Sequence, residues 1–215
     1  MSFYRAAKRA IAPIVKPLGF RCEGRFYYRI VGNVVQQFCL LWLNNDFTIR
    51  FHISSVFDEN DKTMEGEEVV KLINGSNNMW FKDLMDTDGQ NQFGVQEYAD
   101  KCVEVLTEYL LPWFDIASNS ASAYKMVKQT NLYPTIHQEP DSYWCLGFLL
   151  DMEQWERSAD VVKYYLDNSN LYNPKWWETR EQEYRQLYDA LVSGDSTYIE
   201  QYLDDKKART HRLFR

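Results

Sequence analysis

The stretch Arg25–Phe57, RFYYRIVGNVVQQFCLLWLNNDFTIRFHISSVF, decides the fold because it predicts three consecutive antiparallel strands. The outer two strands alternate apolar and polar residues, whereas the middle strand is apolar on both faces over Phe38–Leu43. Such a strand needs cover on both sides of its sheet. The stretch therefore predicts a meander packed inside a larger α+β fold.

Two turns set the register of this meander. Gly32-Asn33 predicts a two-residue hairpin with a positive φ at its first central residue. For the second turn, Asn44–Asp46, we expect three loop residues, which align Leu43 with Phe47. A one-residue slip would move every side chain to the other face, so burial of the apolar set favours the longer loop.

In this register, one face of the sheet carries aromatic and basic side chains: Arg25, Tyr27, Arg29, Phe38, Trp42, Arg50 and His52. Aromatic rings flanked by arginines can stack a planar ligand or hold an anion. The alternative is that a helix covers this face and the arginines pair with acids of the helical half. We favour the covered face, because aromatic stripes are more often core than binding site.

Helices are expected on both sides of the strands. Helical spacing of apolar residues predicts a first helix over residues 3–18, kinked or restarted at Pro13 and capped by Gly19. After the strands, a short helix is expected at Val69–Ile73 and a turn at Asn74–Asn78. A longer apolar stripe begins at Val95 and ends before Pro112. Further helices are predicted at 120–132, 142–151, 154–168, 175–192 and 195–209.

The expected architecture is therefore an N-terminal helix and a three-stranded antiparallel meander, followed by a mostly helical half. We place the domain boundary between residues 1–117 and 118–215.

The N-terminal motifs have a family resemblance. Residues 18–20 (LGF), Gly24, 26–27 (FY), Arg29, 34–36 (VVQ) and 47–49 (FTI) resemble a bacterial family of unknown function that opens with a helix and a meander. The resemblance covers about the first 60 residues and implies no catalytic residues. Some relatives look like small cytosolic proteins of toxin–immunity or other interaction loci. In the C-terminal half, Tyr143, Leu146, Gly147, Leu150, Ala159 and Leu166 are similar to a single tetratricopeptide-type helical pair.

Charge is distributed unevenly along the chain, whose net charge is −7. Residues 1–45 carry seven Lys/Arg against one acid, residues 46–205 carry 12 against 30, and the last ten carry five basic residues and no acid. An acidic body of this size disfavours nucleic acid. We expect the basic ends to meet acidic surface of the same molecule or of a twin subunit, and a homo-oligomer is one alternative.

Motifs for chemistry are missing from the sequence. The three histidines and four cysteines show no metal-ligand spacing, and there is no phosphate loop or nucleophile motif. We assign no catalytic residue, metal or cofactor, although distant residues could still converge, so an enzyme stays open. Cys39 and Cys145 are expected in the core. No apolar run predicts a membrane span or signal peptide, so we expect a cytoplasmic protein.

Our leading functional hypothesis is a non-enzymatic, cytoplasmic bacterial interaction protein, and one form of it neutralises its partner in the manner of immunity proteins. Its acidic helical half would steer toward a basic protein partner such as a nuclease toxin. The residues expected at that contact are Trp177, Glu178, Glu181 and Glu183. The alternative is a small-molecule or anion binder, or a hydrolase, that uses the aromatic-basic face.

Overall fold

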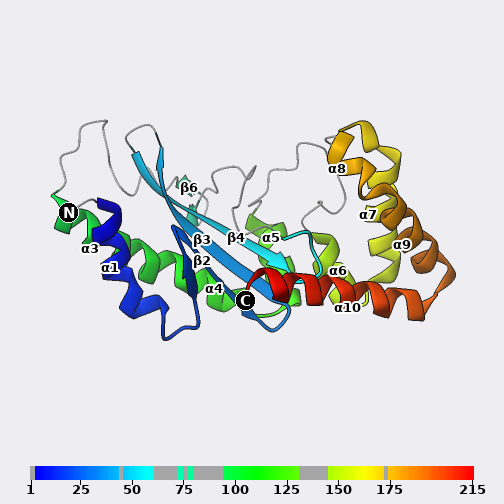
Figure 1. Ribbon diagram of the computed structural model, residues 1–215, viewed down its shortest axis with the longest axis horizontal. Helices are drawn as coiled ribbons and strands as arrows, with labels where there is room; N and C mark the ends of the chain where they lie inside the picture. The colour runs from blue at the N-terminus through cyan, green and yellow to red at the C-terminus, as the bar shows by residue number, and fades with distance from the viewer. Residues whose placement is uncertain are drawn as a thin grey trace. The chain divides into compact units, whose positions relative to one another are not determined.

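The computed structural model describes residues 3–43, 46–60, 72–74, 77–79, 94–130, 145–171 and 174–215. The chain divides into two compact units (Figure 1). Unit 1 comprises residues 1–53 and 61–132, and unit 2 comprises residues 54–60 and 133–215. This division differs from the expected boundary at residue 117, because α5 (Ser120–Thr130) groups with the sheet and residues 54–60 group with the C-terminal helices.

Unit 1 is built on a four-stranded sheet, and the predicted α+β class is confirmed. The strands follow the order of the chain: β1 (Arg21–Glu23), β2 (Phe26–Val31), β3 (Val34–Leu43) and β4 (Asp46–Ser55). The short strand β1 pairs antiparallel with β2 and adds one strand to the expected meander.

The first hairpin forms as predicted. Val31 pairs with Val34, and the two-residue turn has φ +59° at Gly32. A positive φ at this position suits the twist of the flanking strands and is accessible to glycine at little cost.

The register expected for the second hairpin is wrong. The ring of Phe114 lies 6.5 Å from that of Phe38 on β3 and 6.2 Å from that of Phe51 on β4, so both rings point to the same face. A three-residue loop would have put them on opposite faces, because side chains alternate along a strand. The turn residues Asn44 and Asn45 lie outside the described residues. Phe38 and Phe51 thus both gain cover from Phe114 on one face of the sheet.

The helices of unit 1 are α1 (Phe3–Val15), α3 (Val95–Val105), the π-helix η1 (Leu106–Leu110), α4 (Leu111–Ile116) and α5. The expected stop before Pro112 is wrong. Leu111 donates its N–H to the carbonyl of Leu106, five residues earlier, and the chain continues into α4 with Pro112 in the first turn. The proline has no N–H to donate, and the wider i→i−5 turn of the π-helix comes directly before it.

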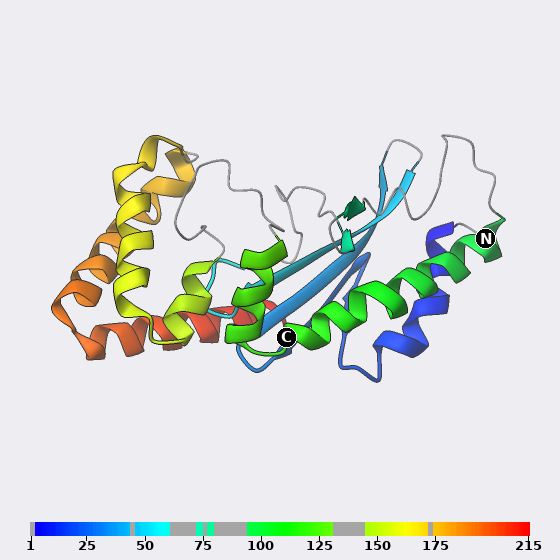
Figure 2. The ribbon, with the colours of Figure 1, turned by 180° about the vertical axis from the view of Figure 1, so that it is seen from behind.

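The first helix packs on the third. Ala6, Ala7, Ile11 and Val15 are buried, and α1 lies beside α3 (Figure 2). The helix does not restart at Pro13, and Gly19 follows it with φ +83°, as expected of a C-terminal cap.

A second, two-stranded sheet consists of β5 (Leu72–Asn74) and β6 (Asn77–Met79). Leu72 and Ile73 were expected in a helix, so that prediction is wrong for these two residues. Residues 69–71 and the centre of the predicted turn, residues 75–76, lie outside the described residues.

Unit 2 is helical in its described C-terminal part. Its helices are α6 (Leu146–Asp151), α7 (Trp155–Asp167), the 3-10 turn η3 (Ser169–Leu171), α8 (Pro174–Glu178), α9 (Glu181–Ser193) and α10 (Ser196–Leu213). The single helix expected over 175–192 is wrong, because the chain turns at Thr179-Arg180 between α8 and α9. The last helix extends four residues beyond its predicted end at residue 209 and includes part of the basic C-terminal segment.

Candidate functional site

The aromatic centre of the predicted sheet face is core. The rings of Tyr27 and Phe38 are stacked, with centroids 4.5 Å apart, and are 1% and 0% exposed. Phe20 and Phe114 pack on the ring of Phe38. Neither Tyr27 nor Phe38 can therefore stack a ligand that arrives from solvent.

Arg29 is held by four groups of unit 1. Its guanidinium donates to Gln36 Oε1 at 2.7 Å and to the Leu18 carbonyl at 2.9 Å, and it lies 3.5 Å from Asp115 Oδ1. It also stacks 4.5 Å above the Phe20 ring. Burial lowers the pKa of Arg29, and Asp115 opposes that effect. Arg29 thus joins β2 to the end of α4, as expected for a covered face.

The other residues of this face are dispersed. Arg25 is exposed and lies 5.1 Å above the Phe26 ring. His52 is buried, and in the observed register it does not share a face with Phe38, since it is the neighbour of Phe51. The side chains of Trp42 and Arg50 lie outside the described residues. The described members of the set do not line an open platform.

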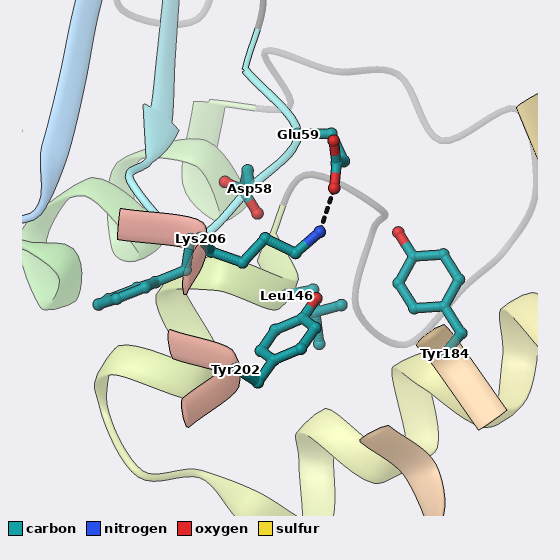
Figure 3. Close-up of a pocket in the computed structure, with 7 residues that line it drawn as sticks. Asp58, Glu59, Leu146, Tyr184, Tyr202 and Lys206 are labelled. Carbon is teal, nitrogen blue, oxygen red and sulfur yellow. Dashed lines mark hydrogen bonds and ion pairs between the residues drawn. The ribbon is translucent and has the colours of Figure 1, made fainter. Parts of the chain in front are cut away.

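A different cluster of charges occupies unit 2. Glu59 follows β4 and forms ion pairs with Arg180, between α8 and α9, and with Lys206 of α10. Figure 3 shows the pair with Lys206. Its carboxylate contacts Lys206 Nζ directly, Arg180 Nη2 at 2.7 Å and Arg209 Nη1 at 3.3 Å. Lys206 Nζ also lies 2.9 Å from Glu183 Oε1. We call Glu59, Arg180, Glu183, Lys206 and Arg209 the Glu59 cluster.

Backbone contacts fix the segment that carries Glu59. Asp58 accepts hydrogen bonds from the N–H groups of Gly147, at 2.9 Å, and Ser55, at 2.7 Å. The Asn60 amide donates to Thr210 Oγ1 at 3.1 Å, and Thr210 donates to the Val56 carbonyl at 2.8 Å. These hydrogen bonds tie residues 54–60 to α6 and α10. They position Glu59 independently of the ion pairs that its carboxylate forms.

The cations control the ionisation of Glu59. Burial by itself would raise the pKa of its carboxyl, but Lys206, Arg180 and Arg209 outweigh burial and lower the pKa. The pKa of the Tyr202 hydroxyl is raised, first by burial and then by the nearby carboxylates of Glu183, Glu59 and Asp58. The cluster therefore holds an ionised carboxylate beside a neutral phenol.

A cavity of about 20 Å³ adjoins this cluster, and Phe57, Asp58, Glu59, Leu146, Tyr184, Tyr202 and Lys206 line it. Such a volume has room for about one water molecule. Lys206 and Glu59 already satisfy each other at its wall. The cavity can hold a water, but it does not accommodate a substrate-sized molecule.

The residues expected at a partner contact have different roles. Trp177 is 7% exposed and stacks on Tyr184 with ring centroids 5.9 Å apart, so it supports the unit internally. Glu183 belongs to the Glu59 cluster. Glu178 is exposed, and Glu181, with 40% of its side chain exposed, pairs with Arg185 one turn later at 2.6 Å.

Sequence reasoning missed the Glu59 cluster, although one signal was present. Ile199, Tyr202 and Thr210 are buried along α10, and Lys206 falls on the same stripe with 4% exposure. A lysine on an apolar stripe predicts a buried carboxylate partner, because an isolated buried ammonium is very costly. The identity of that partner, 147 residues away, could not be deduced.

Two further observations limit the chemistry of the described residues. None of their helices is both long and apolar enough to cross a membrane. Among these residues, no group of three or more His, Cys, Asp or Glu side chains could hold a metal ion. Cys39 and Cys145 are buried, as predicted.

Comparison with family models, curated proteins and solved structures finds no match to this chain. The functional argument therefore depends on geometry and charge.

Proposed function

We propose that this protein is a protein-interaction module that binds a basic partner through an acidic corner, defined as Glu178 and Glu181, at the turn between α8 and α9. The observation that carries this proposal is that the corner is held in place from both sides. A basic protein such as a nuclease toxin has the chemistry that would fit it.

The α8–α9 turn is anchored by the residues around the two acids. Arg180, between them in sequence, is paired with the part-buried Glu59 at 2.7 Å. Trp177 precedes Glu178 and packs on Tyr184 of α9. A contact surface that is already ordered loses less conformational entropy on binding. The two carboxylates are thus presented from a preorganised turn.

The net charge of unit 2 also favours a basic partner. The sequence of unit 2 contains 17 acids against 10 Lys/Arg, a net charge of −7. Exposed acids lie on each of its longer helices: Glu156, Asp160 and Asp167 on α7, Asp189 on α9, and Glu200, Asp204 and Asp205 on α10. A field of one sign accelerates encounter with an oppositely charged protein.

Surface binding is also favoured over ligand binding at the two interior sites described above. The cavity beside Glu59 has room for about one water, and the rings of Tyr27 and Phe38 are buried. The small-molecule alternative consequently has no geometric support from these residues.

The test compares two charge-reversed variants in binding to a partner captured from cells of the source organism and then purified. Glu178→Lys with Glu181→Lys should slow association and weaken its salt dependence, because peripheral charges act mainly on the association rate. Glu97→Lys with Glu108→Lys makes the same charge change at exposed acids of unit 1 and is the control.

Equal association rates for wild type and the corner variant, or equal slowing by both variants, would contradict the proposal. Glu183 is left unchanged in this experiment because its reversal would place a cation against Lys206 and destabilise unit 2.

A further inference from the structure

The outer face of α1 carries a row of cations. Arg5, Arg9 and Lys16 are exposed, and the exposed Ala12 completes a spacing of four, three and four residues. Lys16 follows the helix directly, and its N–H donates to the Ala12 carbonyl at 3.1 Å, so the helical turn continues through it. The opposite, apolar face of α1 is buried. The row spans about 16 Å at 1.5 Å per residue.

The outer face of α7 carries acids at the same spacing. Glu156, Asp160 and Asp167 are exposed, and Lys163 takes the position that Ala12 has in α1. The opposite face of α7 includes the buried Val161, Val162 and Tyr165, and the helix packs on α9. The two rows belong to different units and have opposite charge.

The order of charges selects one alignment of the two helices. With the helices parallel, Arg5, Arg9 and Lys16 face Glu156, Asp160 and Asp167, and Lys163, the cation within the α7 row, faces the uncharged Ala12. The other cation of α7, Arg157, lies outside this row. An antiparallel alignment brings Arg9 opposite Lys163, a like-charge contact that is unfavourable. The two rows of charges are therefore complementary when the helices are parallel, and less so when they are antiparallel.

We propose that α1 of one copy of this chain binds, parallel and side by side, to α7 of a second copy. A bilayer is a poor partner for the α1 row, since the apolar face of α1 is already used within unit 1. Nucleic acid is disfavoured by the net charge of −7. The contact uses neither Glu178 nor Glu181, so it can fail without affecting the proposed function.

The first experiment is sedimentation of the full chain over a range of concentrations. The wild type should associate at low salt and dissociate at about 1 M salt, where the screening length falls to about 3 Å. Arg5→Glu with Arg9→Glu and Lys16→Glu should be monomeric at low salt. The control is Lys125→Glu with Arg212→Glu and Arg215→Glu, which makes the same charge change at exposed residues elsewhere and should associate like wild type.

The second experiment restores the contact by exchanging the charges. Glu156→Lys with Asp160→Lys and Asp167→Lys should also be monomeric alone. A mixture of this variant with the α1 variant should associate, because each reversed row then meets a row of opposite sign. Restoration in the mixture also shows that neither variant lost association by unfolding.

Two results would overturn the proposal: a wild type that stays monomeric at low salt, and a mixture of the two variants that stays monomeric. If the monomeric wild type binds a DNA or RNA duplex and the α1 variant does not, the row is a nucleic-acid contact instead.

Discussion

Gly147 shows how one missing side chain positions the candidate site. A Cβ at this residue would lie 2.5 Å from Asp58 Oδ1 and 2.6 Å from Ser55 Cβ. Glycine is therefore required for segment 54–60 to approach α6 and for Asp58 to accept the Gly147 N–H. The sequence placed Gly147 in a tetratricopeptide-type helical pattern, but the segment that packs against it became visible only in the structure.

Gly147→Ala should reduce the free energy of unfolding by about 1–3 kcal/mol, because the added methyl forces this contact apart. Gly94→Ala is the matched control: its Cβ would meet nothing within 4 Å, and its φ of −65° suits any residue. Urea unfolding of both variants measures the difference. Equal stability of the two variants would show that segment 54–60 shifts to make room for the methyl group without lowering the free energy of unfolding.

Glu59 should make unit 2 sensitive to acid. Because its pKa is lowered in the folded state, its ionisation stabilises the fold fully above the ordinary Glu pKa of about 4.3. That stabilisation is lost as the pH falls through the lowered pKa. Glu59→Gln should cost about 3 kcal/mol at neutral pH, since it leaves buried Lys206 short of a carboxylate.

The difference between wild type and Glu59→Gln should accordingly shrink as the pH is lowered below about 4, which urea unfolding across that range measures. Glu181→Gln makes the same change at a more exposed carboxylate and should show a small difference at every pH. A Glu59→Gln difference that does not vary with pH would argue against an ionised Glu59.

At the scale of elements, the start of α10 is the clearest case of local sequence control. The chain leaves α9 through Gly194, at φ +74°, and Asp195 accepts a hydrogen bond from the Tyr198 N–H at 3.1 Å. Both signals were readable in the sequence, because they involve residues within three positions of one another. The split of the expected helix 175–192 was not, since the turn at Arg180 is held by Glu59, 121 residues away.

Asp195→Ala should destabilise the start of α10 by about 1 kcal/mol, the usual cost of losing an N-terminal cap. Asp204→Ala, an exposed change inside the same helix, is the control and should stay within about 0.5 kcal/mol of wild type. Hydrogen exchange of the amides in the first turns of α10 measures the effect. Unchanged protection in Asp195→Ala would mean that packing alone holds this end.

At the scale of the whole molecule, the chain forms two units, and one segment from the N-terminal half of the sequence belongs to unit 2. Residues 54–60, which begin with the last two residues of β4, belong to unit 2 and supply Glu59, Asp58 and Asn60 to it. Unit 1 takes the rest of the N-terminal 132 residues. A boundary drawn from composition could not assign residues 54–60 to unit 2. Composition gives the residue types of a segment but not the hydrogen-bond and ion-pair partners of its polar groups.

The sequence alone determined the α+β class, the first hairpin, most helices and the uneven charge, because each depends on residues close together in the chain. It also carried the complementary spacings of α1 and α7. Only the tertiary structure decided that the aromatic face is core, that Phe38 and Phe51 share it, and that Glu59 meets Lys206. Those outcomes depend on which groups, distant in the sequence, pack against one another. The periodicity of apolar residues predicts that a side chain is buried, but it does not predict which side chain covers it.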